Sequence, residues 1–202
     1  MLISRNYRLI FIHLQKTAGT SISDFMLSNL MATRDSRKHE YAYEAESRTP
    51  EEIWQNYFKF SFVRNPWDRL VSWYLHINKH HKNTGDNPFF DYLMSIGGTF
   101  EDFILYGDKT ISTPWGERNL FTNQLDQLSL ENQLLVDFVG KFESLESDWK
   151  LILDRVGYTG QAELPHVNAI PRKHYRDLYT EKSRAIVEEK FQKDINQFGY
   201  HF

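Results

Sequence analysis

The sequence predicts a three-layer α/β sandwich with a central parallel sheet. Short apolar or aromatic runs are typical of strands covered on both faces, and helical patterns lie between and after them, which favours parallel strands joined by helices. The composition, 41% hydrophobic and 25% charged, excludes a disordered chain. At 202 residues, we expect residues 1–202 to form a single domain, with a helical or loop insertion at about residues 82–126.

The predicted strands are three short segments of the chain. The first and third are nearly continuous apolar runs, and in the second three phenylalanines alternate with Lys59 and Ser61. Such runs need cover on both faces of the sheet. The strands are expected at residues 8–13 (RLIFIH), 57–63 (YFKFSFV) and 134–142 (LLVDFVGKF).

The predicted helices have apolar residues at helical spacing and recognisable ends. Thr49 can cap a helix that opens with Pro50 and carries Glu52 in a capping box. Gly157 and Gly199 are typical helix terminators. The helices are expected at residues 21–30, from 49–52, 66–80, from 99–102, 145–156 and 181–198.

Charge and composition exclude several function classes. The net charge of −3 gives no broad basic surface, so we expect no nucleic-acid partner. The absence of Cys excludes disulfides, thiolate metal sites and a cysteine nucleophile. No apolar run is long enough for a signal peptide or a membrane span, which predicts a soluble, cytoplasmic chain. His76 and His80 lack a third ligand, so this cluster is interpreted as a solvated helix end and no metal site is predicted.

The segment that joins the first strand to the first helix has the composition of an anion-binding turn. Residues 13–21 read HLQKTAGTS, with a tight turn at Gly19 and hydroxyls at the helix start. Backbone N–H groups converge at a helix N-terminus, and Lys16 adds a full charge. The motif is not the nucleoside-triphosphatase P-loop, because Lys16 precedes Gly19 and the first glycine is missing. The alternative is a plain helix cap with a solvated Lys16.

A second anion-binding element follows the second strand. Arg64 stands at the carboxyl end of this strand, where open α/β sheets bind ligands. Its guanidinium can fork onto a phosphate, and Ser72, about two helical turns later, can bond the same group. The alternative is that Arg64 pairs with a carboxylate and Ser72 fills a helix face. Two such elements favour a ligand with two separate anionic groups.

These motifs together resemble a known family. KTAGTS after FIHL, with FVRNPWDRLVSWY after a second strand, is similar to the sulfotransferases that use 3′-phosphoadenosine 5′-phosphosulfate (PAPS). The similarity is closest to the carbohydrate-type branch, which includes heparan sulfate 2-O-sulfotransferase and bacterial relatives. FVGKFE at 138–143 and LPHVN at 164–168 also match, so the resemblance runs from about Leu9 to Phe202. It implies a P-loop-like sulfotransferase fold.

The resemblance also implies roles for individual residues. The 5′-phosphosulfate would be bound by Lys16, Thr17, Ala18, Gly19, Thr20 and Ser21, with Lys16 near the bridging oxygen. The 3′-phosphate, which remains on the product 3′,5′-adenosine bisphosphate (PAP), would be bound by Arg64 and Ser72. Arg172 or Lys173 would lie on a loop that closes over the nucleotide. The sequence departs from the family at Gln15, where Pro is common, and at residues 169–171.

Transfer to a hydroxyl also needs a base. We favour His39, because the 2-O-sulfotransferase-like branch carries a catalytic His between the two cofactor motifs. Glu40 and His13 are the alternatives. Lys16 and His39 are therefore the predicted catalytic residues, and no metal is expected to be required.

The resulting prediction is a PAPS-dependent sulfotransferase that acts on a hydroxyl of a small-molecule or oligosaccharide acceptor. The alternatives are a nucleotide-dependent phosphotransferase on a P-loop fold and a non-catalytic module that binds a nucleotide or a glycan. Acceptor identity and oligomeric state are not predicted by the sequence.

Overall fold

The computed structural model describes residues 1–34, 39–84, 87–113, 116–131, 133–165 and 174–202, with the backbone alone at 80–84. The chain divides into two compact units. The first unit comprises Met1–Arg64 and Gln124–Ile170, and the second comprises Asn65–Asn123 and Pro171–Phe202. Each has its own apolar core.

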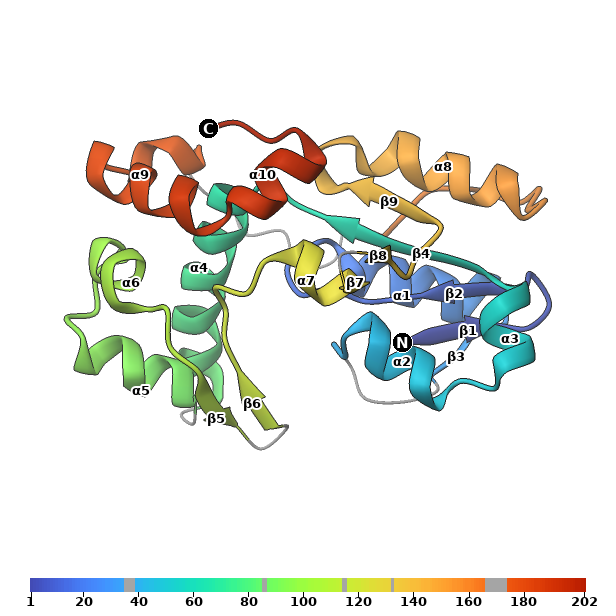
Figure 1. The fold of residues 1–202 in the computed structure, drawn as a ribbon, viewed down its shortest axis with the longest axis horizontal. Helices are drawn as coiled ribbons and strands as arrows, with labels where there is room; N and C mark the ends of the chain where they lie inside the picture. The colour runs from blue at the N-terminus through green and yellow to red at the C-terminus, as the bar shows by residue number, and fades with distance from the viewer. Residues whose placement is uncertain (35–38, 85–86, 114–115, 132, 166–173) are drawn as a thin grey trace. The chain divides into compact units, whose positions relative to one another are not determined.

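The described part of the first unit contains a mixed five-stranded sheet with the order β3-β1-β2-β4-β9 (Figure 1). Strands β2 (Leu9–Phe11), β4 (Phe58–Val63) and β9 (Phe138–Lys141) are parallel. They confirm the three predicted strands and their direction. The central sheet was expected to be parallel and is only mostly so, because β1 (Leu2–Ser4) pairs antiparallel with both β2 and β3 (Thr33–Arg34). β1 and β3, with three and two residues, are too short to leave a periodic pattern.

Both faces of this sheet are covered. Leu9, Phe11, Phe60 and Phe62 pack on one face with α1 (Gly19–Asn29) and α8 (Leu145–Arg155). Side chains alternate between faces along a strand, so Ile10 and Ile12 point to the other side, and both are fully buried. Cover on both faces explains the continuous apolar run of β2. The carboxyl ends of β2 and β4 lead into residues 13–21 and Arg64 respectively.

Short elements complete the described part of the first unit. Thr49 was expected to cap the helix after it, but it does not. Its hydroxyl donates to the Ala45 carbonyl at 2.7 Å and so closes a preceding helix, and Pro50 stands at the N-cap instead. The elements are α2 (Ala42–Arg48), α3 (Glu51–Asn56), α7 (Gln124–Leu128), β7 (Ser129–Leu130), β8 (Gln133–Leu134) and the 3₁₀ turn η1 (Phe142–Ser144).

The described part of the second unit is mainly helical. The long helix α4 (Pro66–Thr84) begins at a cap formed by Asn65, whose Oδ1 accepts from the N–H groups of Trp67 and Asp68 at 3.1 and 3.4 Å. The other elements are α5 (Pro88–Ser95), α6 (Phe100–Tyr106), β5 (Ile111–Thr113), β6 (Gly116–Arg118), the 3₁₀ turn η2 (Tyr175–Leu178), α9 (Glu181–Lys190) and α10 (Gln192–Phe198).

Two features of this unit differ from the expected elements. The β5–β6 hairpin lies in a region where no strand was expected, since its short polar strands lack apolar alternation. The helix expected over 181–198 is interrupted at Phe191, which is fully buried between α9 and α10. Among the described helices, none is both long and apolar enough to cross a membrane.

Candidate functional site

The segment between β2 and α1 is a tight turn with two non-glycine residues in the left-handed region. Lys16 and Ala18 have φ values of 68° and 65°. This conformation costs about 1–2 kcal/mol per residue. The Thr17 hydroxyl, which is fully buried, donates to the Leu14 carbonyl at 2.9 Å and closes the turn. Turns that alternate right- and left-handed residues gather successive N–H groups into a concavity that binds anions.

Helix α1 begins at Gly19, directly after this turn. Gly19 does not have a positive φ; a Cβ at this position would overlap the His13 ring. The glycine is therefore required by close packing rather than by an unusual backbone conformation. Thr20 is half-buried and Ser21 is buried. The first turn of α1 has no acidic residue that would compete with an anion.

Arg64 connects the two predicted anion-binding elements. It follows β4, is only 6% exposed, and donates from a guanidinium nitrogen to the Lys16 carbonyl at 3.0 Å. Its guanidinium carbon lies 3.9 Å from the centroid of the Phe142 ring. The structure thus brings Arg64 to the turn that carries Lys16. The Phe142 contact was not predicted.

The Gln124 side chain holds the backbone of Arg64. Its Oε1 accepts from the Arg64 N–H at 2.9 Å, and its Nε2 donates to the Arg64 carbonyl at 2.8 Å. Gln124 is fully buried, and the pair of bonds imitates the contact of a neighbouring strand. Sequence reasoning missed this residue, because a glutamine that bonds to backbone leaves no side-chain motif.

Two of the predicted cofactor-binding residues, Ser72 and Arg172, are not assigned to the turn by the structure. Ser72 is half-buried on α4 of the second unit. Arg172 lies outside the described residues, as do Lys173 and residues 169–171. Ser72 and Arg172 therefore stay predictions from the sequence.

The three candidate bases lie in different surroundings. The His39 ring, half-buried, is edge-to-face with the His13 ring at 4.4 Å between centroids, and its Nδ1 lies 3.2 Å from the His13 carbonyl oxygen. Glu40 is buried and forms ion pairs with Arg48 and with the Met1 amino group. Arg48 and the Met1 amino group thus hold the Glu40 carboxylate in structural ion pairs. His13 and His39, in contrast, lie beside the turn.

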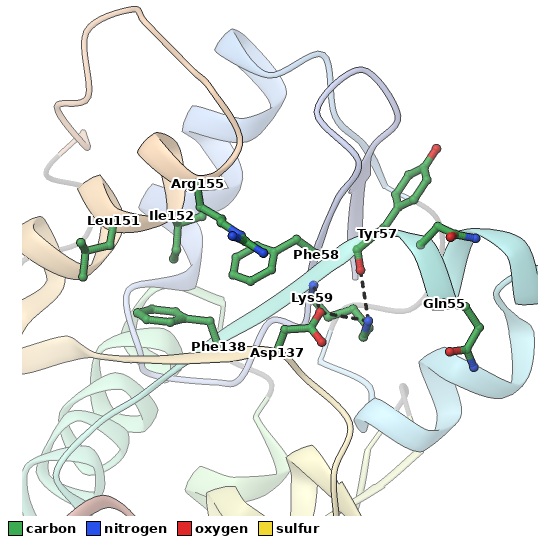
Figure 2. A pocket seen from close by; sticks show the side chains of 10 residues that line it. Gln55, Tyr57, Phe58, Lys59, Asp137, Phe138, Leu151, Ile152 and Arg155 are labelled. Atoms are coloured by element: carbon green, nitrogen blue, oxygen red, sulfur yellow. Dashed lines mark hydrogen bonds and ion pairs between the residues drawn. The ribbon is translucent and has the colours of Figure 1, made fainter.

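A pocket of about 640 Å³ lies elsewhere in the first unit. It is lined by the start of β4 and by α8, at the opposite end of β4 from Arg64. Figure 2 shows the Lys59 ammonium held by the Asp137 carboxylate, at 2.9 Å, and by the Tyr57 carbonyl, at 3.1 Å. The Arg155 guanidinium stands beside the Phe58 ring, with 5.7 Å to its centroid. Because these cations serve local contacts, we place the candidate site at the turn instead.

Metal-binding groups are not gathered in the described part of the chain: no three His, Cys, Asp or Glu side chains there are placed to share an ion. His76 lies on α4, and the His80 side chain is outside the described residues.

Comparison with known proteins gives a family match over nearly the whole chain. The model of the Sulfotransferase family matches residues 1–201. Carbohydrate sulfotransferase 10 of Danio rerio is 26% identical over 76% of this chain and 50% of its own length. Carbohydrate sulfotransferase 14 of Homo sapiens is 26% identical over 99% of this chain and 60% of its own length. An uncharacterized protein of Archaeoglobus fulgidus is 23% identical over 68% of this chain and 98% of its own length.

The chain spans about half the length of the first of these relatives. No solved structure matches it. The family match covers both strand-end motifs, the turn at residues 13–21 and the segment from Arg64 onwards. With the mixed α/β architecture and the Lys16–Arg64 contact, it identifies the chain as a member of the sulfotransferase family.

Proposed function

We propose that this protein transfers a sulfuryl group from PAPS to a hydroxyl of a saccharide, on a P-loop-like sulfotransferase fold. The observation that carries the proposal is the hydrogen bond from the Arg64 guanidinium to the Lys16 carbonyl, at 3.0 Å. It joins two cationic residues from the ends of neighbouring parallel strands. The saccharide acceptor is inferred from relatives named as carbohydrate sulfotransferases.

The donor set of the turn fits a phosphosulfate. Main-chain N–H groups from the turn and the first turn of α1, the Lys16 ammonium and the hydroxyls of Thr20 and Ser21 are all hydrogen-bond donors to an anion. The Thr17 hydroxyl already bonds to Leu14, so Thr17 contributes through its backbone and by shaping the turn. Arg64 and Ser72 are assigned to the 3′-phosphate, as the family resemblance implies, and Arg172 to the closing loop.

The chemistry requires positioning and charge stabilisation. PAPS, when bound, supplies an activated sulfuryl group: its S–O bond to the 5′-phosphate breaks as a new S–O bond forms to the acceptor oxygen. Lys16 stabilises the negative charge that grows on the phosphate oxygen. His39 accepts the proton of the acceptor hydroxyl.

The tautomer of His39 suits this role. A carbonyl oxygen only accepts, so the contact with His13 requires that Nδ1 of His39 carry the hydrogen. In the neutral ring the lone pair is then on Nε2, which is the atom that takes the proton.

The proposal is tested by incubating the protein with radiolabelled PAPS and a panel of saccharides. We expect label on at least one saccharide, and Lys16→Ala should lower the transfer rate about 100-fold or more. Lys150→Ala, which removes an exposed lysine from α8, is the matched control and should leave the rate unchanged. Transfer of phosphate from ATP·Mg²⁺ would indicate a phosphotransferase. PAP binding with no labelled saccharide would indicate a non-catalytic module.

A further inference from the structure

We propose that His13 is a positioning residue, which holds the base His39 in register with the phosphosulfate turn. The inference rests on the proposed function, since it concerns the base of the same reaction. It assigns to His13 a role that is distinct from proton transfer.

The first observation is the confinement of the His13 ring. His13 is 4% exposed, and its ring is stacked on Phe11, with 5.4 Å between centroids and 16° between planes. Phe11 is in turn stacked on Phe60 in the sheet, at 4.9 Å. On another side, the ring occupies the space that a Cβ at Gly19 would need. His13 is thus fixed both to the core of the sheet and to the start of α1.

The second observation is that His13 touches His39 through two groups. Its ring meets the His39 ring edge-to-face at 4.4 Å and 72°, and its carbonyl accepts from Nδ1 of His39 at 3.2 Å. The ring contact fixes where the His39 imidazole lies, and the carbonyl contact fixes its rotation and its tautomer. An imidazole that would otherwise rotate is held with Nε2 as the proton-accepting atom.

The third observation is the backbone of His39. Its φ is 67°, in the left-handed region, which a non-glycine residue adopts only when its surroundings impose it. The ring contact and the hydrogen bond with His13 bear directly on this side chain. We infer that they maintain the unusual conformation and thereby direct His39 toward the turn.

These observations also distinguish His13 from a second base. Proton transfer requires that the acceptor hydroxyl reach a ring nitrogen. The His13 ring is enclosed by Phe11, Gly19 and His39 and has little exposed surface, whereas His39 is half-buried. His13 therefore acts through His39.

The kinetic test compares three variants in the transfer assay. His39→Ala removes the base and should cause the largest loss of kcat, with which the losses of the other two variants are compared. His13→Ala should lower kcat about 10- to 100-fold by misplacing the base, with little change in the KM for PAPS. His13→Phe keeps an aromatic ring in the same place and should recover most of that loss. If His13→Phe falls to the level of His39→Ala, His13 itself moves the proton and the proposal is wrong.

The second test needs no activity. Nitrogen NMR of the histidine-labelled wild-type protein reports which ring nitrogen carries the hydrogen, and His39→Ala identifies the His39 signals. We expect the Nδ1–H form for His39, and Nε2–H as the main form would overturn the proposal. A protein with the expected tautomer but no transfer to any saccharide would instead contradict the proposed function, so the two failures are distinguishable.

Discussion

At the scale of single residues, Arg64 is the cation whose surroundings are best defined. Its guanidinium donates to the Lys16 carbonyl and lies over the Phe142 ring, and these two contacts fix the orientation of the guanidinium plane. We expect Arg64→Ala to weaken PAP binding about 30-fold or more, as removal of a buried charged contact does. Calorimetric titration with PAP measures the change. Arg155→Ala, which removes an exposed arginine from α8, should bind PAP as the wild type does; an equal loss in both variants would contradict a specific role for Arg64.

Gln124 is expected to matter for stability as well as for binding. Gln124→Ala removes both side-chain partners of the Arg64 backbone, at a cost of about 1–3 kcal/mol for buried polar groups. Urea unfolding should show this loss, and PAP binding should weaken because the strand end that carries Arg64 is no longer held. Gln133→Ala, on an exposed residue of β8, should change neither quantity. An unchanged unfolding free energy for Gln124→Ala would show that the two bonds contribute little.

The sequence was sufficient to predict the residues whose role follows from a motif in their own segment. Lys16 and Gly19 were recognised from the turn, and Arg64 from its place at a strand end. Gln124 and Phe142 were not, because each meets Arg64 from a segment far along the chain and by a contact that has no motif. The role of Gly19 also differed from the expected one, since packing against His13 rather than the turn itself excludes a side chain.

At the scale of elements, the junction of β2 and α1 depends on the fit between Gly19 and His13. Gly19→Ala should lower the free energy of unfolding by about 1–3 kcal/mol, because the new methyl group overlaps the His13 ring. The loss should be smaller in a His13→Ala background, where the space is empty. A double-mutant cycle from urea unfolding measures this coupling. Additive effects of the two substitutions would contradict the close approach.

Helix ends illustrate how far a local pattern predicts an element. A helix was expected to open at residues 99–102, and Thr99 caps α6: its hydroxyl accepts from the Asp102 N–H at 3.1 Å, and the Asp102 carboxylate accepts from the Thr99 N–H at 3.2 Å. Thr49 has a similar pattern but closes α2 instead. The difference arises because α2 extends to Thr49. The Thr49 hydroxyl bonds to the last turn of α2 and so does not cap α3.

At the scale of the whole molecule, the division into two units follows from contacts that are remote in sequence. The second unit joins Asn65–Asn123 to Pro171–Phe202, two segments that are separated in the sequence by part of the first unit. For example, the Trp67 indole donates to the Arg184 carbonyl at 3.1 Å. Sequence patterns predict where strands and helices form but not which distant helices share a core. The strands β2, β4 and β9 were therefore predictable, whereas the shared core of α4 and α9 was not.

The second unit also gives an expectation for alkaline pH. Burial, with the nearby Asp68 and Tyr175, raises the pKa of Tyr179 well above its ordinary value of about 10. The folded chain thus holds this proton more tightly than the unfolded chain. The corresponding stability is present below about pH 10 and is lost as the pH rises through the folded pKa.

Tyr179→Phe tests this expectation. The variant loses the hydrogen bond from Tyr179 to the Trp67 carbonyl, 2.9 Å long, and should be less stable at neutral pH by about 1 kcal/mol. Above about pH 10 its unfolding free energy should fall less steeply than that of the wild type. Urea unfolding over a series of alkaline pH values measures both slopes. Parallel slopes would show that Tyr179 does not carry the pH dependence.

The net charge of −3 gives the molecule no general attraction for an anion, so the proposed donor, with its two separate anionic groups, depends on the local cations and N–H groups around Lys16 and Arg64. Calorimetric titration of the wild-type protein with PAP, without metal, and with ATP·Mg²⁺ tests this claim most directly. We expect PAP to bind more tightly than ATP·Mg²⁺, and Lys16→Ala to weaken PAP binding. Tighter binding of ATP·Mg²⁺, or PAP affinity that is unchanged in Lys16→Ala, would contradict the account.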